Sequence, residues 1–298
     1  MSRRHLVMLI ALAAIWGSSF LFIKVAVREL APGDVVFGRV LVGVLALLPA
    51  VPFTVGWGRL AAELRRHALP LIILGVCNAS VPFWLLAWSE KRLDSGLAAV
   101  LQASTPLFTA LVAFGFSRSD RVIGGRLVGV LIGFLGVVLL VGAQPRGDVL
   151  SALAVLGSAL CYAGSALYAG ARLREASPIV TSFGSLLIAT LTTLPLGVTQ
   201  LPDHVPGWKV IGSVAALGAL GLSVAYLLYF GLIAGAGASY AVLVTYLVPA
   251  LALGYGATFL GENVTASAFA GLMLILAGVA LGTGTLRLPR RAPAPETP

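Results

Sequence analysis

The sequence predicts an all-α integral membrane protein of ten transmembrane helices, arranged as two inverted five-helix repeats. Composition is the first observation: 59% of the residues are hydrophobic and 10% are charged, with a mean hydropathy of +1.00. A water-soluble domain carries about 25% charged residues, so lipid must be the solvent for most of this surface. The second observation is that the apolar runs far exceed the strands of about 10 residues that build membrane barrels. The third is an internal repeat.

The internal repeat is visible in charged and proline landmarks. Arg28-Glu29-Leu30-Ala31-Pro32 returns as Arg174-Glu175-Ala176-Ser177-Pro178, at an offset of 146 residues. Ser80-Val81-Pro82-Phe83-Trp84-Leu85 aligns with Ser223-Val224-Ala225-Tyr226-Leu227-Leu228 at an offset of 143. A slowly changing offset is typical of a duplicated unit that has acquired small deletions.

The lengths of the apolar runs define the individual spans. The longest run without charge, 210–261, would form a single helix about 78 Å long, whereas the hydrocarbon core is about 30 Å thick. It must therefore hold two spans, with the break near Gly235 and Gly237. The same reasoning predicts ten spans at 6–25, 34–53, 68–89, 94–116, 123–143, 149–170, 178–200, 209–232, 237–260 and 265–285.

Five spans in each repeat is an odd number, so the second repeat enters the membrane from the opposite side, as in many secondary transporters. We assign the first repeat to residues 1–146 and the inverted second repeat to 147–286. Residues 287–298 form a basic, Pro-rich tail that we expect to be disordered and cytoplasmic.

The basic residues indicate the topology. With a cytoplasmic N-terminus, 13 Lys and Arg residues fall on the cytoplasmic side and five on the outside. The positive-inside rule therefore places both termini in the cytoplasm. It also explains the net charge of +9 without a nucleic-acid partner. The N-terminal apolar run lacks a small-x-small cleavage site, so we expect a span rather than a signal peptide.

Several kinds of chemistry have no signature in the chain. We find no phosphate-binding G-x-x-x-x-G-K-[ST] motif, no H-E-x-x-H motif and no Cys/His cluster. We therefore expect no cofactor, no metal and no enzymatic activity. A membrane-embedded lipid or prenyl enzyme is the alternative from another functional class, and it would need an acidic or His-rich site at a loop mouth.

All 11 acidic residues lie in loops, in the tail or near predicted helix ends. A carboxylate at the bilayer centre costs roughly 2.5–3.5 kcal/mol on insertion scales, so it occurs mainly where function needs it. Proton-driven exporters of cations usually keep one. We therefore expect facilitated transport down the substrate gradient, or coupling through a residue at the edge of the membrane.

Polar and aromatic side chains do occur deep in the predicted spans. Near the midplane of an inverted-repeat transporter, such residues line the substrate site, although interhelical hydrogen bonding is an alternative role. The candidate substrate-binding residues are Trp16, Ser19, Asn78, Gln102, Tyr162, Ser165, Tyr226, Thr245 and Tyr246.

Three further residues are candidates for a hinge or gate. Pro106 and Pro249 occupy corresponding repeat positions and each removes a hydrogen bond from a span interior, which predicts a kink or a widened cavity. Arg39 lies about one turn into the second span and has Ser185 as its repeat partner. We favour snorkelling of Arg39 to the interface, with an outer gate or attraction for a carboxylate substrate as the alternatives.

Glycines spaced by four residues allow close helix approach. Gly125, Gly129 and Gly133 form such a series, and Gly278 and Gly282 form another. They fit helix contacts within one bundle or between two copies, so the sequence is compatible with a monomer or a homodimer.

Three segments resemble a known family. They are Trp16-Gly17-Ser18-Ser19-Phe20 with Lys24, Pro32 and Arg39 after it; Ala98-Ala99-Val100-Leu101-Gln102-Ala103-Ser104-Thr105-Pro106-Leu107; and Phe259-Leu260-Gly261-Glu262 with Gly271 and Gly278. Their order and spacing resemble EamA-type members of the drug/metabolite transporter superfamily, over about residues 6–285. Ser119-Asp120 departs from the Gly-Glu usual in the family at that place.

The resemblance implies ten helices around a central cavity in a bacterial-type inner membrane, and export of small metabolites, often amino acids. Trp, Tyr, Asn and Gln in the cavity, without an acid, fit zwitterions or neutral, partly aromatic molecules. We therefore expect a small-molecule substrate of the amino-acid exporter branch, moved by alternating access within the lipid bilayer. A multidrug or other metabolite exporter of the same superfamily is the alternative.

Overall fold

The computed structural model describes residues 2–116, 125–142 and 148–282. Within these ranges every regular element is a helix, which confirms the all-helical class. The α-helices are α1 (Arg3–Ala26), α2 (Pro32–Leu47), α3 (Val51–Thr54), α4 (Trp57–Arg66), α5 (Ala68–Gly75), α6 (Val81–Ser89), α7 (Ser95–Gln102), α8 (Thr105–Phe116), α9 (Gly125–Gly142), α10 (Val149–Arg172), α11 (Pro178–Thr199), α12 (Trp208–Gly218), α13 (Ala225–Ala236), α14 (Ala238–Ala241), α15 (Val244–Tyr255) and α16 (Ala266–Gly282). A 3-10 helix, η1 (Leu48–Ala50), and three π-helices, η2 (Val76–Ser80), η3 (Ala219–Val224) and η4 (Gly256–Leu260), join some of them.

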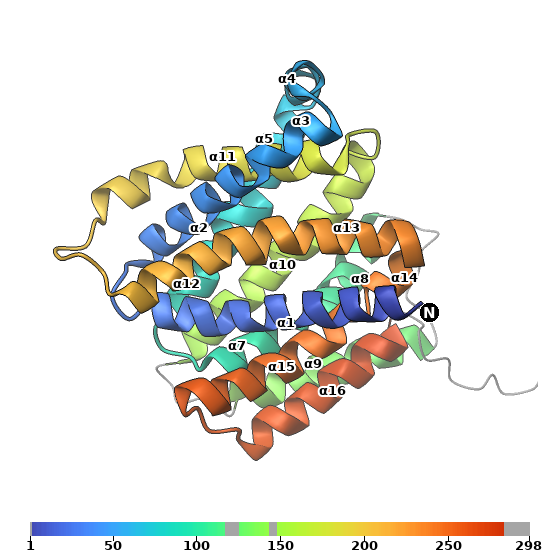
Figure 1. Ribbon diagram of the computed structural model, residues 1–298. Coiled ribbons are helices and arrows are strands. Elements are labelled where there is room, and N and C mark those ends of the chain that lie inside the picture. The colour runs from blue at the N-terminus through green and yellow to red at the C-terminus, as the bar shows by residue number, and fades with distance from the viewer. Residues whose placement is uncertain (1, 117–124, 143–147, 283–298) are drawn as a thin grey trace, which may run out of the picture.

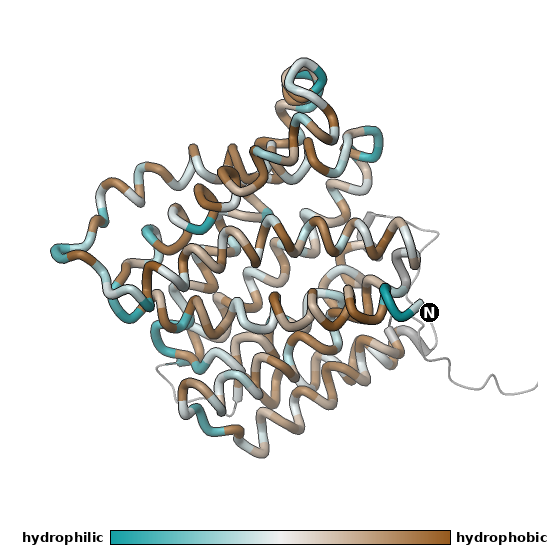
Figure 2. The backbone as a smooth tube through the Cα atoms, in the orientation of Figure 1, coloured by the Kyte–Doolittle hydropathy of each residue, from teal (hydrophilic) through white to brown (hydrophobic). Residues whose placement is uncertain are grey.

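Seven helical segments of the described chain are long and apolar enough to cross a bilayer, and three shorter ones are also apolar. The long segments are Arg3–Ala26, Pro32–Thr54, Ala68–Ser89, Ser95–Ala113, Val149–Arg172, Pro178–Thr199 and Trp208–Ala236, and the shorter ones are Leu127–Gly142, Val244–Leu260 and Ala266–Leu281. They overlap the ten predicted ranges in the same order. The helices run side by side in Figure 1, and the hydrophilic positions in Figure 2 gather mainly at helix ends and connections.

The amphipathic helix α4 was not expected from the sequence. Leu60 is buried, whereas the neighbouring Arg59 is exposed and pairs with Glu63 at 2.7 Å. Glu63 also accepts a hydrogen bond from the backbone N–H of Ser177 at 3.1 Å, and Arg66 pairs with Glu175 at 2.8 Å. Polar contacts of this kind fix α4 against the connection between α10 and α11, which Figure 1 shows at the same end of the bundle.

Two long helical segments are interrupted by π-helical turns that carry a matched contact. The Ser80 hydroxyl donates to the Gly75 carbonyl at 3.2 Å, and the Ser223 hydroxyl contacts the Gly218 carbonyl at 3.5 Å. Each contact spans five residues, which is the spacing of a π-turn. Ser223 also donates to the carbonyl of Gly43 in α2, at 2.9 Å.

The two glycines at these turns lie against neighbouring backbones. A Cβ atom added to Gly75 would lie 2.7 Å from the Ser185 carbonyl oxygen of α11. A Cβ atom added to Gly218 would lie 2.6 Å from the Arg39 carbonyl oxygen of α2. Ser185 and Arg39 are the repeat partners identified in the sequence, so the same close approach occurs twice.

The glycine series of α9 and α16 also meet inside the bundle. Gly278 lies against the backbone of Gly133, and a Cβ atom added to Gly278 would lie 2.7 Å from the Gly129 carbonyl oxygen. Gly136 approaches the Gly271 carbonyl in the same way, at 3.0 Å from its added Cβ. The small-residue series is therefore used between α9 and α16 of a single chain.

The break in the long uncharged run lies where the sequence predicts it. Helix α13 ends at Ala236, and Gly237 follows with φ of +91°, a conformation that L side chains rarely adopt. This turn separates α13 from α14. A second interruption at Val242 and Leu243 then separates α14 from α15.

Two long side chains tie the loop between α6 and α7 to other elements. Lys24, near the end of α1, donates to the carbonyl oxygens of Glu90 at 2.8 Å and Leu93 at 2.6 Å. Lys24 therefore holds this loop through its backbone carbonyl groups. Glu262 accepts from the backbone N–H of Ser95 at 2.8 Å, so it satisfies an otherwise free donor at the start of α7.

We predict that Gly218→Ala destabilises the protein by about 1–3 kcal/mol, because the added methyl group overlaps the backbone of α2 and the helices must separate. Gly75→Ala should have a similar effect against α11. The measurement is the thermal unfolding temperature of the detergent-purified protein. Gly212→Ala is the matched control on α12, since nothing lies within 4 Å of its added Cβ. Equal unfolding temperatures for Gly218→Ala and Gly212→Ala would contradict the close approach.

Candidate functional site

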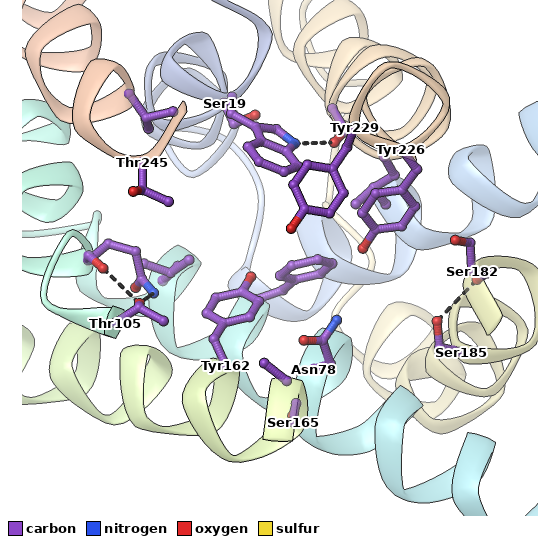
Figure 3. A pocket seen from close by; sticks show the side chains of 18 of the residues that line it. Ser19, Asn78, Thr105, Tyr162, Ser165, Ser182, Ser185, Tyr226, Tyr229 and Thr245 are labelled. Carbon is purple, nitrogen blue, oxygen red and sulfur yellow. Dashed lines mark hydrogen bonds between the residues drawn. The ribbon is translucent and has the colours of Figure 1, made fainter. Parts of the chain in front are cut away.

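A cavity of about 490 Å³ lies among the helices. Residues from α1, α2, α5, α6, α7, α8, α10, α11, α13 and α15, together with residues of η2 and η3, form its walls. Figure 3 shows the tyrosine, serine, threonine and asparagine side chains that surround it. Of the 12 predicted site residues, 11 line this cavity: Trp16, Ser19, Arg39, Asn78, Gln102, Pro106, Tyr162, Ser165, Tyr226, Thr245 and Pro249.

One wall consists of α1 against η3 and α13. The indole N–H of Trp16 donates to the Gly221 carbonyl at 3.2 Å, which satisfies a carbonyl within the η3 π-turn. The Trp16 ring lies 5.5 Å from the ring of Tyr229 at an interplanar angle of 44°. Ser19, one turn further along α1, donates to the Ile15 carbonyl of its own helix at 3.2 Å. Trp16 therefore links α1 to the second half of the chain.

The aromatic side of the cavity surrounds a buried cation. Arg39 is only 5% exposed, and its guanidinium carbon lies 3.8 Å from the centre of the Phe83 ring. The Phe83 ring lies 6.3 Å from that of Tyr162, and Tyr226 lies at the same distance from Phe230. Figure 3 shows the hydroxyl groups of Tyr162 and Tyr226 directed into the shared space. The snorkelling interpretation of Arg39 is therefore wrong, because the side chain is buried at the cavity and not at the interface.

The opposite side holds the two proline positions. Gln102 ends α7, and its amide donates to the Thr105 hydroxyl at 3.0 Å, while that hydroxyl donates back to the Gln102 carbonyl at 2.8 Å. Pro106 is the second residue of the new helix α8 and not part of a helix interior, so the expected kink is a break between α7 and α8. Pro249 does lie inside α15. Its neighbour on the cavity, Thr245, donates to the Val242 carbonyl at 2.7 Å.

The remaining polar residues come from η2, α10 and α11. Asn78 lies in the π-turn η2 and projects into the cavity in Figure 3. Ser165 on α10 is 4% exposed, and its hydroxyl has no hydrogen-bond partner. Ser182 and Ser185 lie one turn apart on α11, and the Ser185 hydroxyl donates to the Ser182 carbonyl at 3.1 Å.

Tyr246 does not line the cavity, unlike its neighbour Thr245. Its ring packs against the apolar cluster that includes Leu101 and Ile275, and its buried hydroxyl has no hydrogen-bond partner. Consecutive residues on a helix point about 100° apart, and here Thr245 faces the cavity while Tyr246 faces the apolar cluster. Placing both residues in the site was wrong on this geometry.

Sequence reasoning missed several lining residues. Phe83 aligns with Tyr226 in the repeat, Tyr229 and Phe230 lie one turn beyond Tyr226, and Ser182 and Ser185 are spaced by three. That spacing of hydroxyl and aromatic residues in an apolar helix was the available signal. Thr105 also went unnoticed because its role depends on the helix break.

Glu90 is the other unexpected residue. It lies in the loop between α6 and α7, yet it is fully buried, and neither carboxylate oxygen has a hydrogen-bond partner. Burial raises the pKa of Glu90 well above its usual range. Lys24 and Arg39 lower the pKa and Glu262 raises it, all by less than burial does. The neutral form of Glu90 is therefore favoured over a wider pH range than in an exposed glutamate.

The described residues that line the cavity include no acidic side chain. Asp120 and Glu296 lie outside the described residues. Among the described residues, no group of three or more His, Cys, Asp or Glu side chains is placed to hold a metal ion. The chemistry that this cavity offers is hydrogen bonding, aromatic contact and a single cation.

Comparison with known proteins gives a consistent identification. The model of the EamA-like transporter family matches residues 3–142 and residues 149–283. A probable amino-acid metabolite efflux pump of Salmonella typhimurium is 27% identical, covering 98% of this chain and 99% of the relative. An uncharacterized transporter of Archaeoglobus fulgidus is 26% identical, covering 89% of this chain and 93% of the relative. A crystal structure that is 18% identical superposes with a TM-score of 0.66, covering 96% of this chain and 98% of that one, and so supports the fold alone.

We predict that Glu90→Gln removes a pH dependence of stability. The folded pKa of Glu90 lies above the ordinary value of 4.5, so stability is greatest below that pH and falls as pH rises through the folded pKa. The glutamine variant cannot ionise, so near pH 8 it should be at least as stable as the wild type. The measurement is the unfolding temperature of purified protein between about pH 5 and pH 8.

Glu175→Gln is the control for this pH series. It removes a carboxylate whose side chain is 75% exposed, where an ion pair contributes little. A Glu90→Gln profile parallel to that of the wild type would show that Glu90 does not ionise in this pH range.

Proposed function

Because the chain belongs to the EamA-like transporter family, we propose that it is a secondary transporter that exports neutral and aromatic amino acids, or similar small metabolites, by alternating access through the central cavity. The name of the Salmonella relative, a probable amino-acid metabolite efflux pump, supports a substrate related to amino acids. The observation that carries the proposal is the cavity, which combines aromatic walls with hydroxyl and amide groups. Its volume of about 490 Å³ lies within the range of small-molecule sites.

The proposed architecture is ten membrane spans in two inverted repeats, at 1–146 and 147–286. Three features support it. The family model matches one stretch in each proposed repeat. The π-turn serines and the glycines before them are 143 positions apart and make corresponding contacts. The first helix of each proposed repeat also packs against the other repeat. Helix α1 contacts α15, and the corresponding helix α10 contacts α7 and α8.

Both proposed repeats contribute to the cavity. The first supplies Trp16 and Gln102, and the second supplies Tyr162 and Thr245. A site at a repeat interface can be opened to either side when one repeat rocks against the other. The basic-residue distribution supports placing both termini in the cytoplasm, with the protein in a bacterial-type inner membrane.

We further propose that transport is facilitative. The absence of a carboxylate among the described residues of the cavity lining supports a cycle without a proton bound at the substrate site. The buried Glu90 lies outside the lining, in the α6–α7 loop.

We predict saturable uptake of labelled neutral and aromatic amino acids into liposomes that contain the purified protein, compared with protein-free liposomes. Tyr162→Ala, Gln102→Ala and Asn78→Ala should each reduce the flux while leaving membrane insertion intact. Loss of one hydrogen bond or ring contact costs about 1 kcal/mol, so a several-fold effect is expected. Tyr240→Ala is the matched control, because Tyr240 is exposed and does not line the cavity. Wild-type flux in all three cavity variants would overturn the site assignment.

We predict that an imposed proton gradient leaves the direction and extent of this uptake unchanged. The assay should be repeated with a pH-sensitive dye inside the liposomes. Stoichiometric movement of protons with substrate would exclude the facilitative mechanism. If Glu90→Gln then abolished that movement, coupling would be assigned to the α6–α7 loop.

A further inference from the structure

Arg39 carries an uncompensated charge at the cavity. It is the one charged side chain among the described residues that line this space. The ion pairs formed within the described chain join Arg59 to Glu63 and Arg66 to Glu175, and neither involves Arg39. The Nε atom of Arg39 is buried without a hydrogen-bond partner. A buried guanidinium usually pairs with an anion, because an isolated charge in a low-dielectric site is costly.

The surroundings of Arg39 compensate this charge only in part. Its guanidinium stacks on the Phe83 ring, a cation–π contact that leaves the N–H groups in the guanidinium plane available. Tyr162, Tyr226 and Glu90 are the groups that interact with it electrostatically. Glu90 forms no ion pair with it, and Lys24 is bound to the Glu90 backbone instead. The Glu90 carboxyl also tends to stay neutral because it is buried.

A positively charged group on a ligand would have no comparable partner in the described lining. For an ammonium group, the described cavity lining offers hydroxyl oxygens, amide oxygens and aromatic faces, but no carboxylate. A second carboxylate on the ligand would likewise find no second cation. The cavity therefore favours a ligand that has one negative group next to an apolar or aromatic body.

We propose that Arg39 binds the carboxylate of the transported molecule, and that the cavity accepts monocarboxylates with an apolar or aromatic body whether or not they carry an amino group. This inference rests on the proposed transport function and refines its substrate class. A planar guanidinium can bind both oxygens of a carboxylate, which a hydroxyl or amide cannot do. Tyr162 and Tyr226 are positioned to contact the same group.

A matched ligand series tests the inference through binding, apart from transport. Phenylalanine, phenylpyruvate and phenethylamine share a phenyl ring. Phenylalanine carries both charged groups, phenylpyruvate the carboxylate alone and phenethylamine the ammonium alone. At roughly 10 mM, where even a millimolar site is largely filled, phenylalanine and phenylpyruvate should raise the unfolding temperature of the purified protein. Phenethylamine and sodium chloride at the same concentration should not. Protection by phenethylamine, equal protection by chloride, or no protection by either carboxylate would overturn the inference.

Substitution of Arg39 locates the effect. Arg39→Gln should weaken binding of both carboxylates about ten- to hundredfold, because a charge-assisted hydrogen bond is lost, and Arg39→Lys should retain part of it. Arg92→Gln is the control, since it removes the same charge from an exposed position outside the cavity. If Arg39→Gln binds phenylpyruvate as the wild type does, the inference is wrong. Should that variant fail to fold, the ligand series on the wild type and on Arg39→Lys still decides.

Flux measurements separate this inference from the proposed function. Arg39-dependent binding of carboxylates without flux of amino acids would support the carboxylate site and contradict amino-acid transport. Flux of phenylalanine with the same KM in wild type and Arg39→Gln would support transport and contradict the carboxylate site. Flux of both phenylalanine and phenylpyruvate, lost in Arg39→Gln, supports both.

Discussion

The close approach of helix backbones at glycine is the constraint on which the rest of this structure depends. In lipid, apolar side chains gain little by leaving one apolar environment for another, so helices associate through backbone proximity and packing. Gly75 against α11, Gly218 against α2 and Gly278 against Gly133 provide that proximity at three places. Fixing these contacts leaves the space between α1, α10, α13 and their neighbours unfilled. The cavity therefore depends on tight contacts elsewhere in the bundle.

Many polar backbone groups inside the bundle are bound by side chains. Backbone groups freed by irregular turns are bound by side chains: Trp16 binds the Gly221 carbonyl, Thr105 binds the Gln102 carbonyl and Ser80 binds the Gly75 carbonyl. Irregular backbone at membrane depth is tolerated where it borders protein or a cavity. The polar atoms left without partners, among them Arg39 Nε and the Ser165 hydroxyl, are thus the ones to explain by a ligand or by motion.

The all-helical class and the ranges of the apolar helices were accessible from the sequence, because the length of an apolar run reflects the thickness of the bilayer. The cavity residues Trp16, Gln102 and Tyr162 were accessible because polar groups are rare inside apolar helices. The burial of Arg39 and of Glu90 was not predicted, for a shared reason. A residue close to a helix end in the sequence is expected to be exposed to solvent. The burial of Glu90 is instead set by the packing of distant parts of the chain, such as Lys24 of α1. Tyr246 was misplaced because the direction of a side chain after the Val242–Leu243 break cannot be read from spacing.

Arg39 has serine, not a second cation, at the corresponding place in the other half of the chain. Among the described lining residues Arg39 is therefore the single charge, and in the proposed cycle a bound monocarboxylate anion would cancel it. Displacement of one charge through a potential of 100 mV changes the free energy by about 2.3 kcal/mol. In the proposed cycle, reorientation of the ligand-free protein is voltage-sensitive to the extent that Arg39 changes depth. The form that holds a monocarboxylate anion is insensitive at this site, whereas a bound zwitterion restores one positive charge through its ammonium group. The asymmetry of a single side chain thus gives the membrane potential a means of setting the resting orientation.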